Sequence, residues 1–183
     1  MSDPQGLTPE FALGLRHLML DGLNREFETT KKVIAVIPDS KFDYKPDPNA
    51  RSAWELAWHL ASAEVQMLAG IADMKFTMEE PNPADKPSNT AELTAWYEKH
   101  FKQESARIAG LSAGQLMTRV DFFGAFNMPD VFYLGFVNNH SIHHRGALAT
   151  YLRPMGAKIP SIYGGSYDEP WQGAETEAET TAA

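Results

Sequence analysis

The sequence contains no cysteine, and this absence narrows the chemistry open to the protein. Without thiol groups the chain has no disulfide framework, no cysteine nucleophile and no thiolate ligand, so any metal must be bound by histidine and carboxylate side chains. With 183 residues, the chain is long enough to bury a core without cross-links. Metal-ligand candidates are therefore sought among its six histidines.

Long apolar runs and an excess of basic residues are also missing. No stretch approaches the roughly 18 apolar residues of a membrane-spanning helix, and the first ten residues show no basic region followed by an apolar run. Sixteen basic and 24 acidic residues give a formal net charge of -8, which argues against a general nucleic-acid-binding protein. We therefore expect a cytoplasmic protein that acts on a small molecule and binds neither nucleic acid nor a membrane.

Apolar periodicity and capping residues predict four long helices. Thr8 followed by a proline, and the capping-box sequences that begin at Ser52 and Asn89, are typical of helix N-termini. Pro129 is expected to start the last helix and Pro154 to end it. The expected helices cover about residues 9–37, 53–72, 90–110 and 129–153.

Helices of this length, joined by long connections, predict an all-α fold: a four-helix bundle with at least one crossover connection. Residues 111–128 mix alternating and aromatic character, which is compatible with a short hairpin or an ordered loop. We expect one domain over residues 1–167, in which residues 157–167 pack over one end of the bundle. The acidic, low-complexity tail over residues 168–183 is predicted to be disordered.

Three histidines have a placement that suits a metal site. His140 and His144 lie one helical turn apart, so they share one face of the last helix, and His143 offers an alternative partner for His140. His59 lies on the second helix at the border between its apolar side and a polar stripe. The alternative for each of these histidines is an exposed or hydrogen-bonded ring that binds nothing.

Two known types of metal site do not fit the sequence. A zinc protease of the HExxH type needs a glutamate directly after the first histidine, and Ser141 occupies that position. No pair of Glu-x-x-His motifs is present, which a di-iron carboxylate bundle requires. His17 and His100 have no neighbouring histidine at ligand spacing, and we interpret both as structural or surface residues.

Two segments of the sequence carry a resemblance to a known family. The segments are AWHLA at 57–61 and HSIHHRGALATYLR at 140–153, the second followed by Gly156, Pro160 and Tyr163-Gly164. With them the chain resembles the DinB-like proteins (DinB/YfiT-type metalloenzymes) over about residues 10–165. The resemblance implies a four-helix bundle with a divalent metal, most commonly zinc or nickel, bound by His59, His140 and His144. His143 is then a neighbour of the site and not a ligand.

The resemblance also implies an activity. Relatives use low-molecular-weight thiols, so this chain is expected to be a metal-dependent, thiol-dependent transferase that acts on a small electrophilic molecule, with metal-assisted hydrolysis as a variant. Three imidazole ligands leave open positions on the metal, as catalysis requires. The alternative is a non-catalytic, homodimeric helical protein of stress response whose metal is structural or fortuitous.

Other residues near these motifs have open roles. Many relatives carry glutamine where this chain has Ala147, so any support that the glutamine gives to a ligand is missing. Arg145 is either an anion contact or a surface charge, and Glu55 is either a general base or the capping-box acid. Four aromatic residues are candidates for a pocket wall or for core packing, namely Trp54, Trp58, Phe136 and Tyr151.

Overall fold

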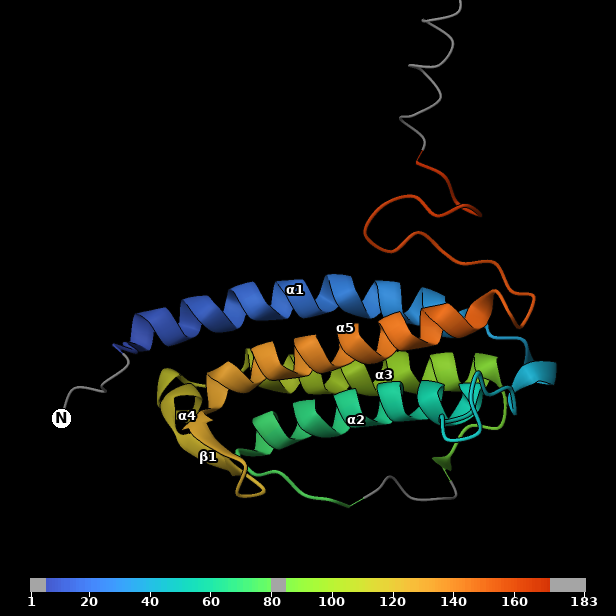
Figure 1. Cartoon of the computed structure of the whole chain (residues 1–183). Helices are drawn as coiled ribbons and strands as arrows, with labels where there is room; N and C mark the ends of the chain where they lie inside the picture. Colours follow the sequence, from blue (N-terminus) through green and yellow to red (C-terminus); the bar gives the residue numbers. More distant parts are fainter. Residues whose placement is uncertain (1–5, 80–84, 172–183) are drawn as a thin grey trace, which may run out of the picture.

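The computed structural model describes residues 6–79 and 85–171, in which four long helices run side by side (Figure 1). The helices are α1 (Pro9–Ala35), α2 (Ala53–Asp73), α3 (Thr90–Ala109) and α5 (Tyr133–Leu152). This arrangement confirms the predicted four-helix bundle.

The first three helices begin where the capping residues predicted. The hydroxyl of Thr8 accepts a hydrogen bond from the backbone N–H of Phe11 at the start of α1. At the start of α2, Ser52 and Glu55 form a complete capping box. Asn89 caps α3 through its side chain, but the carboxylate of Glu92 accepts from the backbone N–H of Ser88 and not from that of Asn89. Local capping residues therefore mark these helix starts, and at α3 the hydroxyl of Thr90 also donates to the backbone carbonyl of Ile37.

The order of the helices around the bundle differs from their order in the chain. Helix α1 packs against α3 and α5, and α2 packs against the same two helices, so α1 and α2 lie diagonally opposite. Helices α2 and α3 run in the same direction, since the ends of both meet where Arg107 pairs with Asp73. The chain must therefore return along the whole bundle between α2 and α3, which is the predicted crossover connection (Figure 1).

One end of the bundle carries a short helix and a hairpin. Helix α4 (Ala113–Met117) is followed by strands β1 (Arg119–Phe122) and β2 (Phe126–Pro129), which pair antiparallel with Val120 opposite Met128. The hairpin was one of two predicted possibilities, whereas α4 was not predicted. Its signal is another capping box, formed by Ser112 and Gln115.

The start predicted for the last helix is wrong by four residues. Pro129 belongs to β2, and the backbone N–H of Asp130 donates to the carbonyl of Thr118 at the other side of the hairpin. A single turn of 3-10 helix, η3 (Asp130–Phe132), then leads into α5. The strand pairing holds the proline in extended backbone, so the helix begins only at Tyr133.

Loops follow α1 and α5 at the other end of the bundle. A second 3-10 turn, η1 (Asp39–Lys41), follows α1, and residues 157–171 fold back after α5 (Figure 1). In this loop the carboxylate of Asp168, the first residue of the predicted tail, accepts hydrogen bonds from Arg153 and from the backbone N–H of Ile159. The rest of that tail, residues 172–183, lies outside the described residues. Among the described helices, none is long and apolar enough to cross a membrane.

Candidate metal centre

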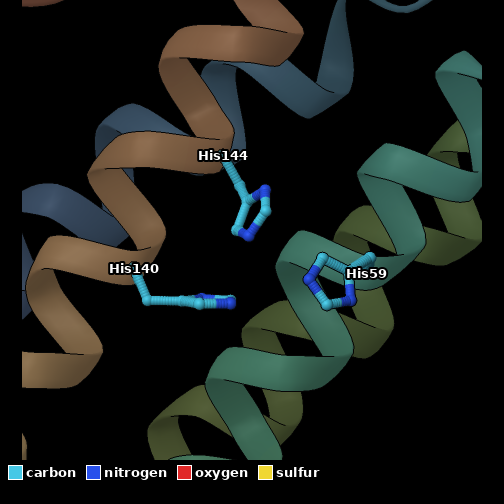
Figure 2. Close-up of side chains that lie close together, drawn as sticks. All are labelled: His59, His140 and His144. Atoms are coloured by element: carbon cyan, nitrogen blue, oxygen red, sulfur yellow. The ribbon is translucent and has the colours of Figure 1, made fainter. Parts of the chain in front are cut away.

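The three predicted ligands come together between α2 and α5. His140 and His144 project from successive turns of α5, and His59 projects from α2 on the other side of the gap (Figure 2). One ligand nitrogen of each ring lies within 4.8 Å of one nitrogen of each other ring. Two nitrogens that share an ion at about 2 Å each lie at most about 4 Å apart, so small side-chain rotations suffice to close the site.

Helix geometry explains why these residues meet. A separation of four residues places His140 and His144 on the same face of α5, with ring centroids 4.4 Å apart. Because α2 packs against α5, this face lies opposite His59, whose centroid is 4.6 Å from that of His144 and 5.4 Å from that of His140. All three side chains are half-buried, so the cluster remains open to a small molecule.

The surroundings keep the three imidazoles neutral. Burial, because desolvation disfavours the imidazolium ion, and then the neighbouring rings of His59 and His143 together lower the pKa of His140 to about 4. Burial followed by repulsion from His140 lowers the pKa of His144 to about 4 as well. The pKa of His59 is lowered by burial and by the positive charge of Arg51. Neutral rings have free lone pairs, which is the form that binds a metal.

One buried atom in the cluster has no protein partner. Nδ1 of His140 is buried and makes no hydrogen bond to any described residue. A buried polar atom without a partner raises the free energy of the folded protein, and such atoms are rare. A divalent ion, or a ligand held by one, would satisfy this site, so the donor set fits a metal.

The remaining histidines do not join the cluster. His143 is exposed and contacts only the edge of the site, with its ring centroid 4.9 Å from that of His144. His17 is exposed beside Asp21, and His100 packs against Trp96. His144 and not His143 joins the cluster because His144 lies on the side of α5 that faces α2.

An apolar cavity of about 380 Å³ extends from the imidazoles toward the hairpin end of the bundle. Its walls come from α2, the segment after α2, the hairpin and α5. The lining residues are His59, Ala63, Gln66, Met67, Phe76, Thr77, Met78, Phe122, Phe123, Phe136 and His140. Two of the three candidate ligands thus form one end of this cavity.

The wall that follows α2 depends on a glycine. Helix α2 ends at Met74 in left-handed backbone, which turns the chain back over the helix. A Cβ atom on Gly70 would lie 2.3 Å from Cδ1 of Phe76, so only glycine allows this ring to pack so closely on the helix. Phe76 then meets the hairpin, edge to face with Phe122 at 4.9 Å between centroids.

Of the four aromatic residues considered for a pocket wall, one lines the cavity and three pack on other aromatic rings. Phe136 lines the cavity, one turn before His140. Trp54 packs on Phe42, Trp58 on Trp96, and Tyr151 on Tyr44, and none of the three is in the cavity wall. The remaining wall residues were not predicted, because they come from three separate segments whose proximity the sequence does not reveal.

Arg145 is not the surface charge that one interpretation predicted. Only 1% of its side chain is exposed, and its guanidinium lies 2.6 Å from the carboxylate of Glu26 on α1. It also donates to the hydroxyls of Thr30 and Tyr163, and Tyr163 in turn donates to Glu26. Both terminal nitrogens of the guanidinium are bonded within the protein, and the side chain faces α1, on another side of α5 from the cluster, so Arg145 is not placed as an anion contact of the metal centre.

Glu55 serves as the capping acid. Its carboxylate accepts a hydrogen bond of 2.7 Å from the backbone N–H of Ser52, which holds the pKa of this carboxyl below its usual range. Lys45 lies 3.8 Å from the same carboxylate oxygen. This environment stabilises the ionised form and weakens the carboxylate as a proton acceptor.

Comparison with known proteins agrees with this architecture. The model of the DinB family matches residues 3–178. The uncharacterized protein YrdA of Bacillus subtilis (strain 168) is 24% identical over 148 residues, which cover 79% of this chain and 85% of YrdA.

Two solved structures are similar. A DinB-like protein from Bacillus cereus ATCC 10987 is 26% identical, with a TM-score of 0.67 over 79% of this chain and 95% of that one. The DinB-like protein YjoA of Bacillus subtilis, 21% identical, has a TM-score of 0.65 over 79% and 96% of the two chains.

Proposed function

We propose, from the premise that this chain belongs to the DinB family, that it is a divalent-metal-dependent enzyme which transfers a small thiol to an electrophilic molecule. The observation that carries the proposal is the set of three neutral imidazoles that converge beside an apolar cavity. His59, His140 and His144 would hold the ion, with zinc or nickel as the first candidates since both accept imidazole.

The protein's own residues account for several parts of this function. The three imidazoles contribute no negative charge, so an ion held by them would keep its full positive charge, which favours an anionic sulfur. When bound, such an ion supplies a Lewis acid that lowers the pKa of a thiol. The reaction forms a carbon–sulfur bond, the leaving group departs with the electron pair of the broken bond, and the thiol proton passes to water. Because the chain has no cysteine, the sulfur must come from a cosubstrate.

The test is metal and thiol binding by the full chain, purified without an affinity tag. We expect elemental analysis to find one divalent metal per chain, and calorimetry to show that thiols bind only to the metal-loaded protein, with release of a proton. His140→Ala should weaken metal binding at least about a hundredfold, since it removes one ligand of three. The matched control His143→Ala removes an exposed neighbour on the same helix and should leave metal binding unchanged.

The alternative is a structural metal in a non-catalytic, homodimeric protein, and it predicts a different outcome. In that case His140→Ala should lower the melting temperature substantially, whereas with a catalytic site stability changes little and thiol-dependent turnover disappears. A metal-loaded protein that binds no member of a panel of bacterial thiols would refute the transferase proposal. The cytoplasmic location and the homodimer remain predictions from the sequence.

A further inference from the structure

Among the residues that the structure describes, none with a charged side chain lines the cavity beside the metal centre. Every described lining residue other than the imidazoles of His59 and His140 is apolar, a threonine or a glutamine. The amide of Gln66 already donates to the backbone carbonyl of Glu79. Away from the imidazole end, a charged group placed in this cavity would lose its hydration without gaining an ionic partner.

The direction of the cavity relative to the imidazoles is fixed by the two helices. Along α2 its wall continues from His59 to Ala63 and then to Met67, one and two turns further on. Along the antiparallel helix α5 it continues from His140 back to Phe136. The cavity therefore leads away from the ligand nitrogens toward the hairpin, whereas Arg51 precedes α2, on the opposite side of His59 along that helix.

We infer that this cavity binds the uncharged, apolar part of the electrophilic substrate, an aryl or alkyl group, with the reacting carbon at the imidazole end. This inference rests on the proposed function and names its substrate class. The volume of about 380 Å³ lies within the range of small-molecule sites, and phenylalanine and methionine walls suit a planar or flexible apolar group. A cysteine-derived thiol carries charged groups, so it fits the side of the centre where Arg51 lies better than this cavity.

Two fluorescent probes that differ by one charged group test the inference on the full chain. N-phenyl-1-naphthylamine is uncharged, and 1-anilinonaphthalene-8-sulfonate is the same skeleton with a sulfonate. On the metal-free chain we expect one neutral probe to bind per chain, about tenfold or more tighter than the sulfonate, because the described wall then offers no cation. Equal affinity for the two probes, or no binding of the neutral probe, would overturn the inference.

Two phenylalanines of the hairpin provide a matched pair of variants. Phe123 lines the cavity and is 45% exposed, whereas Phe126 is 47% exposed and does not line it. Phe123→Asp places a carboxylate at the cavity wall and should weaken the neutral probe about tenfold, while Phe126→Asp should change its affinity less than about twofold. Phe123 has left-handed backbone, with φ of 53°, which aspartate tolerates, so folding is preserved.

A third variant fills the cavity without adding charge. Ala63→Phe, on the half-buried face of α2, should also abolish binding of the neutral probe. If Phe126→Asp weakens the probe as much as Phe123→Asp, or if Ala63→Phe leaves the affinity unchanged, the probe binds elsewhere and the inference fails.

Zinc binding, measured in parallel, separates this inference from the proposed function. A chain that binds zinc but not the neutral probe refutes the inference and leaves the metal-dependent function standing. A chain that binds the probe in the cavity but no divalent metal refutes the proposed function, and with it the assignment of the occupant as an electrophile.

Discussion

Arg145 and His144 are consecutive residues of α5, but their polar groups lie in different surroundings because they face different helices. Arg145 faces α1, is fully buried, and has each of its contacts supplied by Glu26, Thr30 and Tyr163. His144 faces α2 in a half-buried cluster beside His140, whose Nδ1 has no partner among the described residues. A buried charge that is paired within the protein joins two helices, whereas converging imidazoles with one buried nitrogen unpaired, beside a cavity, are where a ligand is expected.

The largest expected loss of stability follows from replacing Arg145, on the side of α5 that faces α1. Arg145→Met leaves the carboxylate of Glu26 without its cation, so we expect the free energy of unfolding to fall by about 3 to 5 kcal/mol. Chemical denaturation measures this loss. The double variant with Glu26→Gln should recover part of it, because the unpaired charge is then removed as well.

A matched surface variant sharpens the same result. Arg153 pairs with Asp168 at 2.8 Å but is half exposed, so Arg153→Met should cost less than about 1 kcal/mol. If Arg145→Met costs no more than Arg153→Met, the buried network does not stabilise the bundle and the contrast between the two sides of α5 is lost.

The next largest effect is a change of stability with pH, caused by the buried carboxyl of Asp130. Like Nδ1 of His140 it lacks hydrogen-bond partners among the described residues, but it does not line the cavity. Burial raises the pKa of Asp130 to about 7, and neither of its carboxylate oxygens has a partner among the described residues. Since the folded state holds this proton more tightly than the unfolded chain, unfolding free energy should fall as pH rises from about 4 to about 7. The fall is at most about 4 kcal/mol, at 1.4 kcal/mol per pKa unit.

Asp130→Asn should remove that part of the pH dependence. We expect the variant to gain stability relative to the parent chain between pH 4 and pH 8, as measured by urea denaturation at each pH. The exposed residue Asp43 provides the control, because Asp43→Asn should follow the parent at every pH. If the unfolding free energy of Asp130→Asn changes with pH as that of the parent chain does, ionisation of the Asp130 carboxyl costs little stability.

The smallest expected effect concerns Glu55, and it distinguishes a helix-capping role of this residue from a catalytic role. Glu55→Ala should lower the unfolding free energy by about 1 kcal/mol through loss of the cap, with metal binding unchanged. Glu55→Gln can still accept the hydrogen bond from Ser52, so it should retain both stability and thiol-dependent turnover. A loss of turnover with Gln, at unchanged stability, would make Glu55 the general base.

The starts of the first three helices could be predicted from the sequence, whereas the hairpin boundary and the start of α5 could not. Helix starts at Thr8, Ser52 and Asn89 follow from local hydrogen bonds within four residues, so the sequence suffices to predict them. The start of α5 was misplaced because β1, ten residues earlier, holds Pro129 in a strand. Pairing between segments overrides the local preference of a residue, and local patterns do not contain that information.

The candidate site divides in the same way. The spacing of His140 and His144 is a property of one helix, and the resemblance to DinB-like proteins added His59 from another. The apolar cavity was not predicted beyond Phe136, because its wall combines α2, the turn at Met74 and the hairpin. The partners of Arg145 were also missed, since Glu26 lies 119 residues earlier in the chain.

By itself, then, the sequence determined the helices, the lack of any thiol and the shared face of two histidines, since each depends on residue types or on the 3.6-residue period of a helix. Only the tertiary structure decided which side of α5 meets α2 and which meets α1. That choice leaves His140 and His144 beside a cavity and encloses Arg145 with its partners. The physical reason is that solvation and pairing of a side chain depend on distant segments that only packing brings together.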